Sequence, residues 1–113
     1  MDDLTAFQRD ILYCLHKAAD TEETPYGLGI KRELESYYNH DINHGRLYPN
    51  LDELVDKDLI EKGALDKRTN FYEITERGRR GIEARHEWED QPFGASREGD
   101  DQSREGETAQ PSA

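Results

Sequence analysis

The sequence predicts a mainly α-helical fold that includes one small β hairpin. Apolar residues recur at intervals of three and four along three successive segments, which is the period of an amphipathic helix. Two short segments rich in β-branched and aromatic residues then flank a charged turn and indicate paired strands. The chain of 113 residues is long enough for one domain whose core holds only a few such elements.

The first helix is expected within residues 4–19. Thr5 is a candidate N-cap, because its hydroxyl can accept a hydrogen bond from a backbone N–H of the first turn. One face of this helix is apolar and consists of Leu4, Phe7, Ile11, Leu12, Leu15, Ala18 and Ala19.

The second helix is expected over residues 24–38. Thr24 and Pro25 form a typical helix start, with the hydroxyl as N-cap and the proline at the first helical position. Gly27 and Gly29 weaken this helix, so we expect them to allow packing or the close approach of another group.

The third helix is expected over residues 43–57. Its apolar side consists of Leu47, Leu51, Leu54 and Val55. Pro49 falls within its first two turns and has no N–H to donate to the carbonyl of Gly45. We therefore expect a helix that is slightly distorted at its front.

The hairpin is expected from the segments "DLIEKGAL" and "NFYEIT", which are joined by a basic turn. A last helix follows over residues 76–90, with Thr75 as N-cap. Trp88 stands so near the end of this charged helix that too little chain remains to bury it. A partner subunit is therefore the expected cover for this side chain.

Three helices, a hairpin and a further helix are the order of a winged helix-turn-helix DNA-binding domain plus one C-terminal helix. We assign residues 1–90 to this domain, with the last helix expected to form a dimer. Residues 91–113 are rich in Gly, Ser, Gln and acidic residues and hold one aromatic residue, so we expect a disordered acidic tail.

The charge of the chain is strongly acidic, with 15 basic and 26 acidic residues and a formal net charge of −11. Taken alone, this charge argues against binding to nucleic acid. Residues 62–80, however, hold six basic and three acidic side chains, a local charge of +3. The five lysines stand against ten arginines, and an acidic surface poor in lysine suggests a protein of a high-salt cytoplasm.

Several classes of protein are disfavoured by what the sequence lacks. The single cysteine, Cys14, excludes an internal disulfide and a thiolate cluster, and its expected place on an apolar face favours an inert thiol. No segment has the length of a membrane span, and the start "MDD" is unlike a signal peptide, so a cytoplasmic protein is expected. We find no catalytic motif and no cofactor motif. We also expect no metal site, because a site needs three or four converging ligands and His40 and His44 are interpreted as unrelated surface residues.

Four short motifs stand at successive places along these elements. They are Tyr26-Gly27-Leu28, Gly45-Arg46-Leu47-Tyr48-Pro49-Asn50-Leu51 with Leu54, Asp58-Leu59-Ile60, and Tyr72-Glu73-Ile74-Thr75 with Gly78-Arg79. Over about residues 8–82 they resemble the PadR family of winged-helix transcriptional regulators. The acidic bias resembles the small halophilic archaeal members of that family, one group of which responds to oxidants.

The chain departs from the family pattern in three ways. Leu28 replaces the usual aromatic residue, and Asp58 replaces the usual glycine. The longer C-terminal helical region through which many members dimerise is absent. The resemblance therefore implies a homodimer formed by the single last helix, expected together with the first helix. The expected interface residues are Phe7, Ile11, Ile82, Arg85 and Trp88.

The third helix is the expected recognition helix, and only its N-terminal end is suited to the major groove. Asp52, Glu53 and Asp56 cluster on its outer face and would repel phosphates. Arg46 can donate two hydrogen bonds to guanine O6 and N7, although an ion pair with a neighbour such as Glu53 is the alternative. The candidates for DNA contact are Tyr26, Gly27, Asn43, His44, Gly45, Arg46, Tyr48, Asn50, Lys67, Arg68 and Thr69.

Other roles stay open for some of these residues. Asn43 and His44 can cap the helix instead of contacting DNA, and the Tyr48 hydroxyl can contact a phosphate or its ring can pack internally. Lys67 and Arg68 lie at the expected tip of the wing, residues 62–73, which in this fold contacts the backbone or the minor groove. Backbone N–H groups at Tyr26 and Gly27 can face a phosphate.

The expected function is sequence-specific regulation of transcription by a homodimer that binds double-stranded DNA at inverted-repeat operators. The alternative is a winged-helix module that binds another protein and not DNA, which the acidic net charge favours. Neither the operator nor a small-molecule effector can be named from the sequence. If carboxylates face the phosphates, cation uptake on binding makes the dependence of affinity on salt shallow or reversed.

Overall fold

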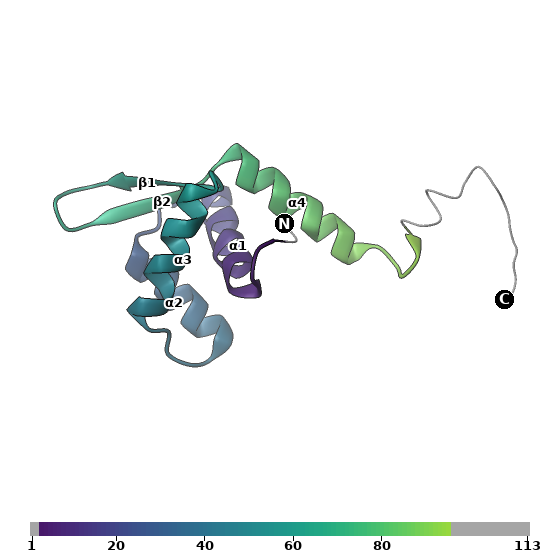
Figure 1. The fold of residues 1–113 in the computed structure, drawn as a ribbon, viewed down its shortest axis with the longest axis horizontal. Coiled ribbons are helices and arrows are strands. Elements are labelled where there is room, and N and C mark those ends of the chain that lie inside the picture. Colours follow the sequence, from purple (N-terminus) through teal and green to yellow (C-terminus); the bar gives the residue numbers. More distant parts are fainter. Residues whose placement is uncertain (1–2, 96–113) are drawn as a thin grey trace, which may run out of the picture.

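The protein is described by a computed structural model over residues 3–95. Its elements run in the predicted order, helix, helix, helix, strand, strand, helix (Figure 1). They are α1 (Ala6–Asp20), α2 (Gly27–Tyr38), α3 (His44–Asp56), β1 (Ile60–Ala64), β2 (Asn70–Ile74) and α4 (Glu76–Asp90). In Figure 1 the hairpin projects from one side of the three-helix unit, and α4 leaves on the opposite side. The predicted mainly α winged-helix fold is confirmed.

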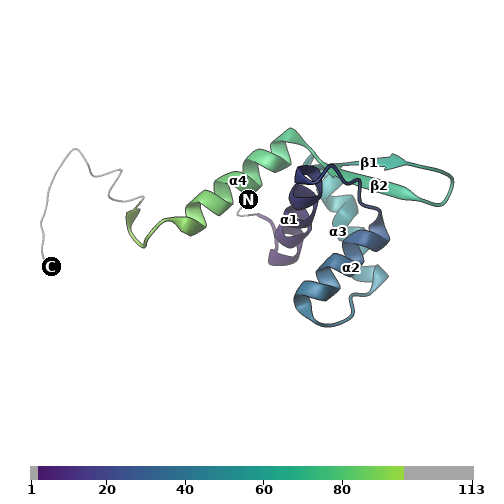
Figure 2. The ribbon, with the colours of Figure 1, turned by 180° about the vertical axis from the view of Figure 1, so that it is seen from behind.

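Helix α1 is the central element of the domain. It contacts α2, α3, α4 and β2, and the view from behind in Figure 2 shows it between α4 and the α2–α3 pair. The predicted cap is present, because the backbone N–H of Gln8 donates to the Thr5 hydroxyl at 3.1 Å. The Gln8 side chain accepts in return from the Thr5 backbone N–H at 3.2 Å, which completes a capping box.

Helix α2 begins later than the sequence suggested. We predicted Thr24 as N-cap and Pro25 as the first helical residue, and this prediction is wrong. The helix begins at Gly27, and its N-cap Tyr26 has an extended backbone (φ −90°, ψ 166°). The carbonyl of Pro25 accepts a hydrogen bond from the Tyr72 N–H at 3.0 Å, and Tyr26 bridges Phe71 of β2. Pairing with the hairpin therefore outweighs the local preference for a helix start.

Helix α3 closely follows its predicted bounds. The side chain of its N-cap Asn43 accepts from the Arg46 N–H at 3.1 Å, and the helix runs through Pro49 to Asp56. Asp58 after its end has a left-handed backbone (φ 62°). Its N–H donates to the carbonyl of Val55, and the Leu59 N–H donates to that of Leu54, which is a Schellman arrangement.

The core lies where α1, α2 and α3 meet the hairpin. Strands β1 and β2 are antiparallel, with Ile60 opposite Ile74 and Lys62 opposite Tyr72. The Tyr72 ring is buried although it lies on a two-stranded sheet, because α1 and α2 cover that face. The buried apolar side chains are Leu4, Phe7, Ile11, Leu12, Leu15, Ile30, Leu34, Ile42, Leu47, Leu51, Leu54, Leu59, Ile60, Tyr72 and Ile82.

This core corrects part of the expected dimer interface. Ile11 and Ile82 are 0% and 2% exposed, and Phe7 is 5% exposed. Side chains so fully covered within one chain present no surface to a partner. Arg85 and Trp88 lie farther along α4, and Trp88 is 59% exposed.

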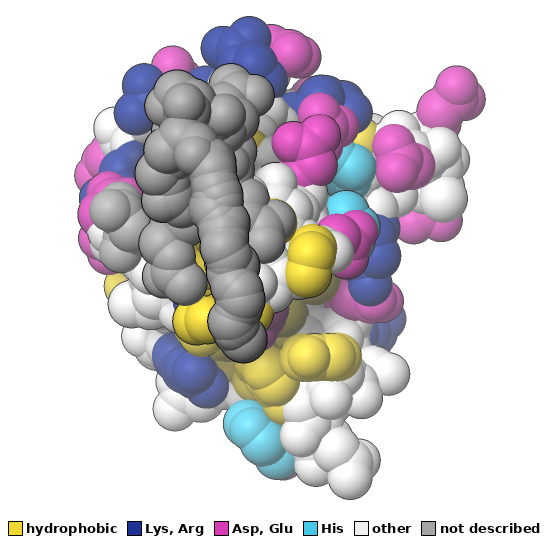
Figure 3. Space-filling view, turned by 90° about the vertical axis from the view of Figure 1, so that its right-hand side faces the viewer, with side chains coloured by type: hydrophobic (Ala, Val, Ile, Leu, Met, Phe, Trp, Pro, Cys, Tyr) yellow, Lys and Arg dark blue, Asp and Glu magenta, His cyan; other side chains and the backbone are white. Residues whose placement is uncertain are grey.

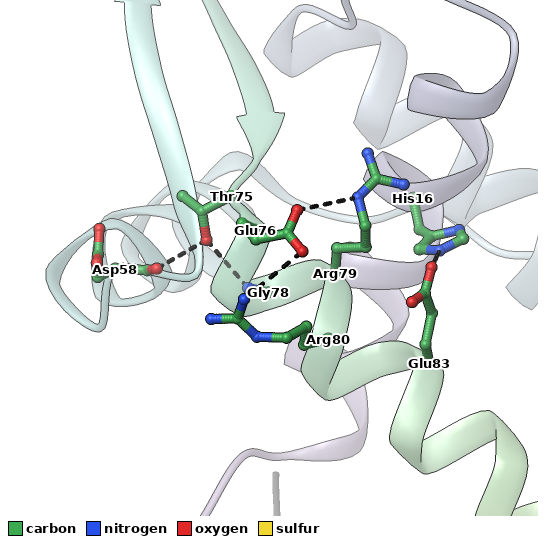
Figure 4. Close-up of polar contacts among 8 residues, drawn as sticks. All are labelled: His16, Asp58, Thr75, Glu76, Gly78, Arg79, Arg80 and Glu83. Atoms are coloured by element: carbon green, nitrogen blue, oxygen red, sulfur yellow. Dashed lines mark hydrogen bonds and ion pairs between the residues drawn. The ribbon is translucent and has the colours of Figure 1, made fainter.

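Helix α4 is fixed to the domain at its first turns, as Figure 4 shows. The Thr75 hydroxyl accepts from the Gly78 N–H at 3.0 Å and donates to the carbonyl of Asp58 at 2.8 Å (Figure 4). Farther along, His16 of α1 lies 3.1 Å from the Glu83 carboxylate. The predicted N-cap is thus present, and it joins α4 to the segment that ends α3.

No helix within residues 3–95 is long and apolar enough to cross a membrane.

Candidate nucleic-acid interface

The N-terminal end of α3 is an exposed surface. His44, Gly45 and Arg46 are exposed in its first turn, directly after the cap residue Asn43. Because the Asn43 side chain accepts from the Arg46 N–H, its oxygen is already used within the protein. His44 stacks on the Tyr48 ring, with 5.3 Å between the ring centroids and 19° between their planes.

The guanidinium of Arg46 lies over the Phe7 ring of α1, with 3.9 Å between its central carbon and the ring centroid. This is neither of the two placements that the sequence suggested, which were an outward-pointing side chain and an ion pair with Glu53. Stacking on a ring face uses the flat side of the guanidinium and leaves its N–H groups, which lie in its plane, able to donate.

Asn50 is joined to α1 rather than pointing freely outward. Its side-chain oxygen accepts from the Gln8 amide at 2.9 Å, and its side-chain nitrogen donates to the carbonyl of Arg46 at 2.7 Å. Gln8, which is 3% exposed, was not among the predicted site residues. The spacing of Thr5 and Gln8 signals a capping box, but nothing local in the sequence signals the contact with Asn50.

The start of α2 lies against α3 through a glycine. A Cβ atom added to Gly27 would lie 2.2 Å from the Tyr48 hydroxyl oxygen, so only glycine leaves room for this tyrosine. The expected close approach at Gly27 is therefore real. A Cβ at Gly29 would meet nothing within 4 Å, so the same expectation fails there. Gly27 is therefore buried against the half-buried Tyr48, and the neighbouring Tyr26 is exposed.

The turn between α2 and α3 is held by Glu35. Its carboxylate accepts from the Ile42 backbone N–H at 2.8 Å and pairs with Lys31 at 2.7 Å. The bond from Ile42 and then that from Lys31 lower the pKa of the Glu35 carboxyl. This anchor lies immediately before Asn43 and so positions the first turn of α3.

The tip of the hairpin is an ordered turn with exposed basic side chains. The Asp66 carboxylate accepts from the backbone N–H of Arg68 at 2.8 Å and from that of Thr69 at 2.9 Å. These two bonds lower the pKa of the Asp66 carboxyl. Lys67 and Arg68 are exposed, whereas Thr69 is half-buried. The predicted wing residues therefore lie together at the end of the hairpin.

The outer side of α3 is acidic beyond its first turns. Asp52, Glu53 and Asp56 are exposed, and Lys62 of β1 lies 3.9 Å from Asp52. This pair is too exposed and too long to contribute much stability. The Lys62 side chain nevertheless places one positive charge beside these three carboxylates, between α3 and the hairpin.

Cys14 is a half-buried residue of α1. Burial raises the pKa of the Cys14 thiol to about 12, so the thiol is protonated at neutral pH. Residues 3–95 hold no group of three or more His, Cys, Asp or Glu side chains that could bind a metal ion.

The outer end of α4 carries exposed apolar surface. The guanidinium of Arg85 lies 5.3 Å from the centre of the Trp88 ring system. Figure 3, which looks toward this end of the molecule, shows apolar side chains exposed among charged ones. Large exposed aromatic side chains are typical of surfaces that a partner covers.

Comparison with known proteins identifies one family pattern. The pattern of the transcriptional regulator PadR-like family matches residues 15–84. This range includes α2, α3, the hairpin and the start of α4. None of the curated proteins matches the chain.

Solved structures agree with this family. RosR of H. salinarum, from crystals grown from NaBr, is 57% identical over 76% of this chain and 74% of its own, with a TM-score of 0.69. The RosR structure described as the complex hsRosR-S1 is 54% identical over 83% of this chain and 80% of its own, with a TM-score of 0.73. A PadR-like transcription factor from Bacteroides fragilis is 23% identical over 74% of this chain and 80% of its own, with a TM-score of 0.61, which shows a shared fold.

Proposed function

This chain belongs to the PadR-like family of transcriptional regulators, and we propose that it reads an inverted-repeat operator as a homodimer. It is a DNA-binding regulator of transcription and not an enzyme. Its acidic surface and its similarity to RosR of H. salinarum mark it as a halophilic protein. We place it in the cytoplasm, where a regulator of this family meets chromosomal DNA.

The proposed docking places the N-terminal end of α3 in the major groove. Arg46 is the base-reading residue, because an arginine with free in-plane donors fits guanine O6 and N7. His44, Gly45 and the backbone near Asn43 then lie beside the groove. The Asn50 side chain supports Arg46 by donating a hydrogen bond to its carbonyl. The exposure of Arg46 in the first turn of α3 is the observation that carries this docking.

Phosphate contacts are proposed on two sides of this helix. Tyr26 and Tyr48 offer hydroxyls near the start of α2 at Gly27, and the N-terminus of a helix favours an anion. Lys67 and Arg68 at the hairpin tip reach the backbone or the minor groove, with Thr69 beside them. The ordered turn around Asp66 supports this role, because it fixes the direction of the tip.

The homodimer is proposed to form through the outer part of α4. Trp88 is its central residue and Arg85 lies beside it. Two-fold symmetry then sets two α3 helices about 34–36 Å apart, one helical turn of DNA. An inverted-repeat operator with that spacing follows from this arrangement.

The test is a binding measurement on DNA selected from a random duplex library by the wild-type protein. Arg46→Ala should weaken binding by about five- to 150-fold, because a bidentate contact contributes ~1–3 kcal/mol. Arg68→Ala should weaken binding to all duplexes by a similar factor. Arg80→Ala is the matched control, since Arg80 is exposed and pairs with Glu76 on α4.

If neither Arg46→Ala nor Arg68→Ala weakens binding, the docking is wrong. If no duplex is retained, the protein-interaction alternative replaces it.

A further inference from the structure

Two neighbouring residues of α1 touch the reading end of α3 from behind. Phe7 lies under the Arg46 guanidinium, and Gln8 bonds to the Asn50 side chain. Neither belongs to α3, and neither has an exposed side chain that DNA can reach. Their contacts nevertheless end on the residue proposed to read a base and on its neighbour one turn later.

The first contact places the Arg46 guanidinium over the Phe7 ring. A free arginine side chain has many rotamers, and ordering it on binding costs conformational entropy. The Phe7 ring removes part of that freedom before DNA arrives, because the central carbon of the guanidinium lies over the ring, 3.9 Å from its centroid. Tyr38 also stacks on Phe7, with 6.1 Å between the two ring centroids and 24° between the ring planes. The ring is therefore a supported surface.

The second contact holds the backbone of the same residue. Hydrogen bonds run in sequence from the Thr5 N–H to Gln8, from the Gln8 amide to Asn50, and from the Asn50 amide to the Arg46 carbonyl. A buried amide with both of its groups bonded has few alternative orientations. This sequence of bonds acts in a part of α3 where Pro49 removes one backbone donor.

We propose that Phe7 and Gln8 are positioning residues that preset Arg46 for base reading, so that specificity at one base pair depends on α1. The proposal rests on the proposed docking of Arg46. Phe7 fixes the side chain, and Gln8 fixes the backbone through Asn50. Neither residue contacts DNA.

The test measures discrimination, which is the ratio of the affinity for the selected duplex to the affinity for a duplex changed at one base pair. The probe is a duplex selected by the wild-type protein, together with its variants changed at one base pair each. Arg46→Ala identifies the base pair at which discrimination is lost. Phe7→Leu keeps an apolar side chain but removes the ring, and it should lower discrimination at that same base pair by about two- to fivefold. In the Arg46→Ala background, Phe7→Leu should have no further effect.

Gln8→Glu is the second variant. It keeps an acceptor for the Thr5 N–H but loses the donor to Asn50, and it should also lower discrimination at that base pair. Thr5→Ala is its matched control, because it removes the α1 cap and leaves the Gln8–Asn50 contact. Thr5→Ala should lower thermal stability and leave discrimination unchanged. Gln8→Glu also keeps the proposal testable if Phe7→Leu does not fold.

The outcomes separate the two proposals. If Arg46→Ala changes discrimination nowhere, the docking of Arg46 fails and this inference fails with it. If Arg46→Ala acts but neither Phe7→Leu nor Gln8→Glu changes discrimination at its base pair, only the inference is overturned. The same conclusion follows if Phe7→Leu keeps its full effect in the Arg46→Ala background, or if Thr5→Ala lowers discrimination as much as Gln8→Glu.

Discussion

The hydroxyl of Thr75 donates a hydrogen bond to the carbonyl of Asp58 at 2.8 Å and accepts one from the Gly78 N–H at 3.0 Å. One side chain therefore joins the first turn of α4 to the segment that ends α3. A backbone hydrogen bond adds to this junction, since the Thr75 N–H donates to the carbonyl of Leu59, the residue after Asp58, at 3.1 Å. Helix α4 thus leaves the domain in a direction set by the segment that ends α3.

Replacing Thr75 should measure how much this junction contributes. Thr75→Ala is expected to lower the free energy of unfolding by about 1–2 kcal/mol, because it removes an N-cap and a second hydrogen bond. Thr75→Ser keeps the hydroxyl and should lie close to the wild type. Urea unfolding checks both values. A Thr75→Ser variant as unstable as Thr75→Ala would contradict the role of the hydroxyl.

Replacing Asp58 with glycine should stabilise the folded protein. Its φ of 62° is strained for a residue with a Cβ atom, and glycine adopts it freely. Asp58→Gly is therefore expected to raise the free energy of unfolding by about 1 kcal/mol. Asp58→Ala is expected to lower it, because alanine keeps the Cβ and loses a side chain that can bond locally. Thermal unfolding of the pair tests this, and a less stable glycine variant would show that the Asp58 carboxylate matters more than the backbone.

The order of the wing tip should depend on pH through Asp66. Because its carboxyl pKa is lowered below the ordinary 3.8, the ionised form is the one that the folded turn stabilises. That stabilisation is fully present above the unfolded pKa of ~3.9 and is lost as pH falls through the lower folded value. The amide NMR signals of Arg68 and Thr69 should therefore shift together with a midpoint below pH 3.8.

Asp66→Asn is the control for this titration. Its amide keeps an acceptor oxygen but cannot ionise in this range. The pH-dependent shift of the Arg68 and Thr69 amides should disappear, while the turn remains at neutral pH. A shift that persists in Asp66→Asn would assign the titration to another group.

Trp88 should control the oligomeric state. Removing a central aromatic residue from an interface commonly costs at least ~2 kcal/mol, so Trp88→Ala should raise the dimer dissociation constant by about thirtyfold or more. Leu65→Ala is the matched control, since Leu65 is a large exposed apolar residue at the hairpin. Sedimentation equilibrium measures both. An unchanged dimer in Trp88→Ala would place the interface elsewhere.

The dependence of DNA affinity on salt should be shallow or reversed. Phosphate contacts alone make affinity fall steeply as salt rises, because counterions are released. Here Asp52, Glu53 and Asp56 are exposed on the outer side of the proposed recognition helix, and carboxylates brought near phosphates take up cations. Replacing all three with Asn or Gln should restore a steep negative slope in titrations across potassium chloride concentrations. A steep slope in the wild type would remove cation uptake from the mechanism.

Much of the fold could be predicted from the sequence because its signals are local. The period of the apolar residues predicted the first three helices, and the β-branched and aromatic residues around a charged turn predicted both strands. The caps Thr5 and Thr75 were found because each bonds to a backbone N–H three residues later. The exposed start of α3 at Asn43 also followed from the positions of its leucines and its outer carboxylates.

The tertiary structure decided what depends on residues far apart in the chain. It moved the start of α2 to Gly27, since Pro25 pairs with Tyr72, and it buried Ile11 and Ile82 in one core. It also placed Arg46 on Phe7 and Asn50 against Gln8, a contact across 42 residues. A periodic pattern shows which side of each helix is apolar. The packing of one helix against another determines which polar side chain of α3 meets which residue of α1.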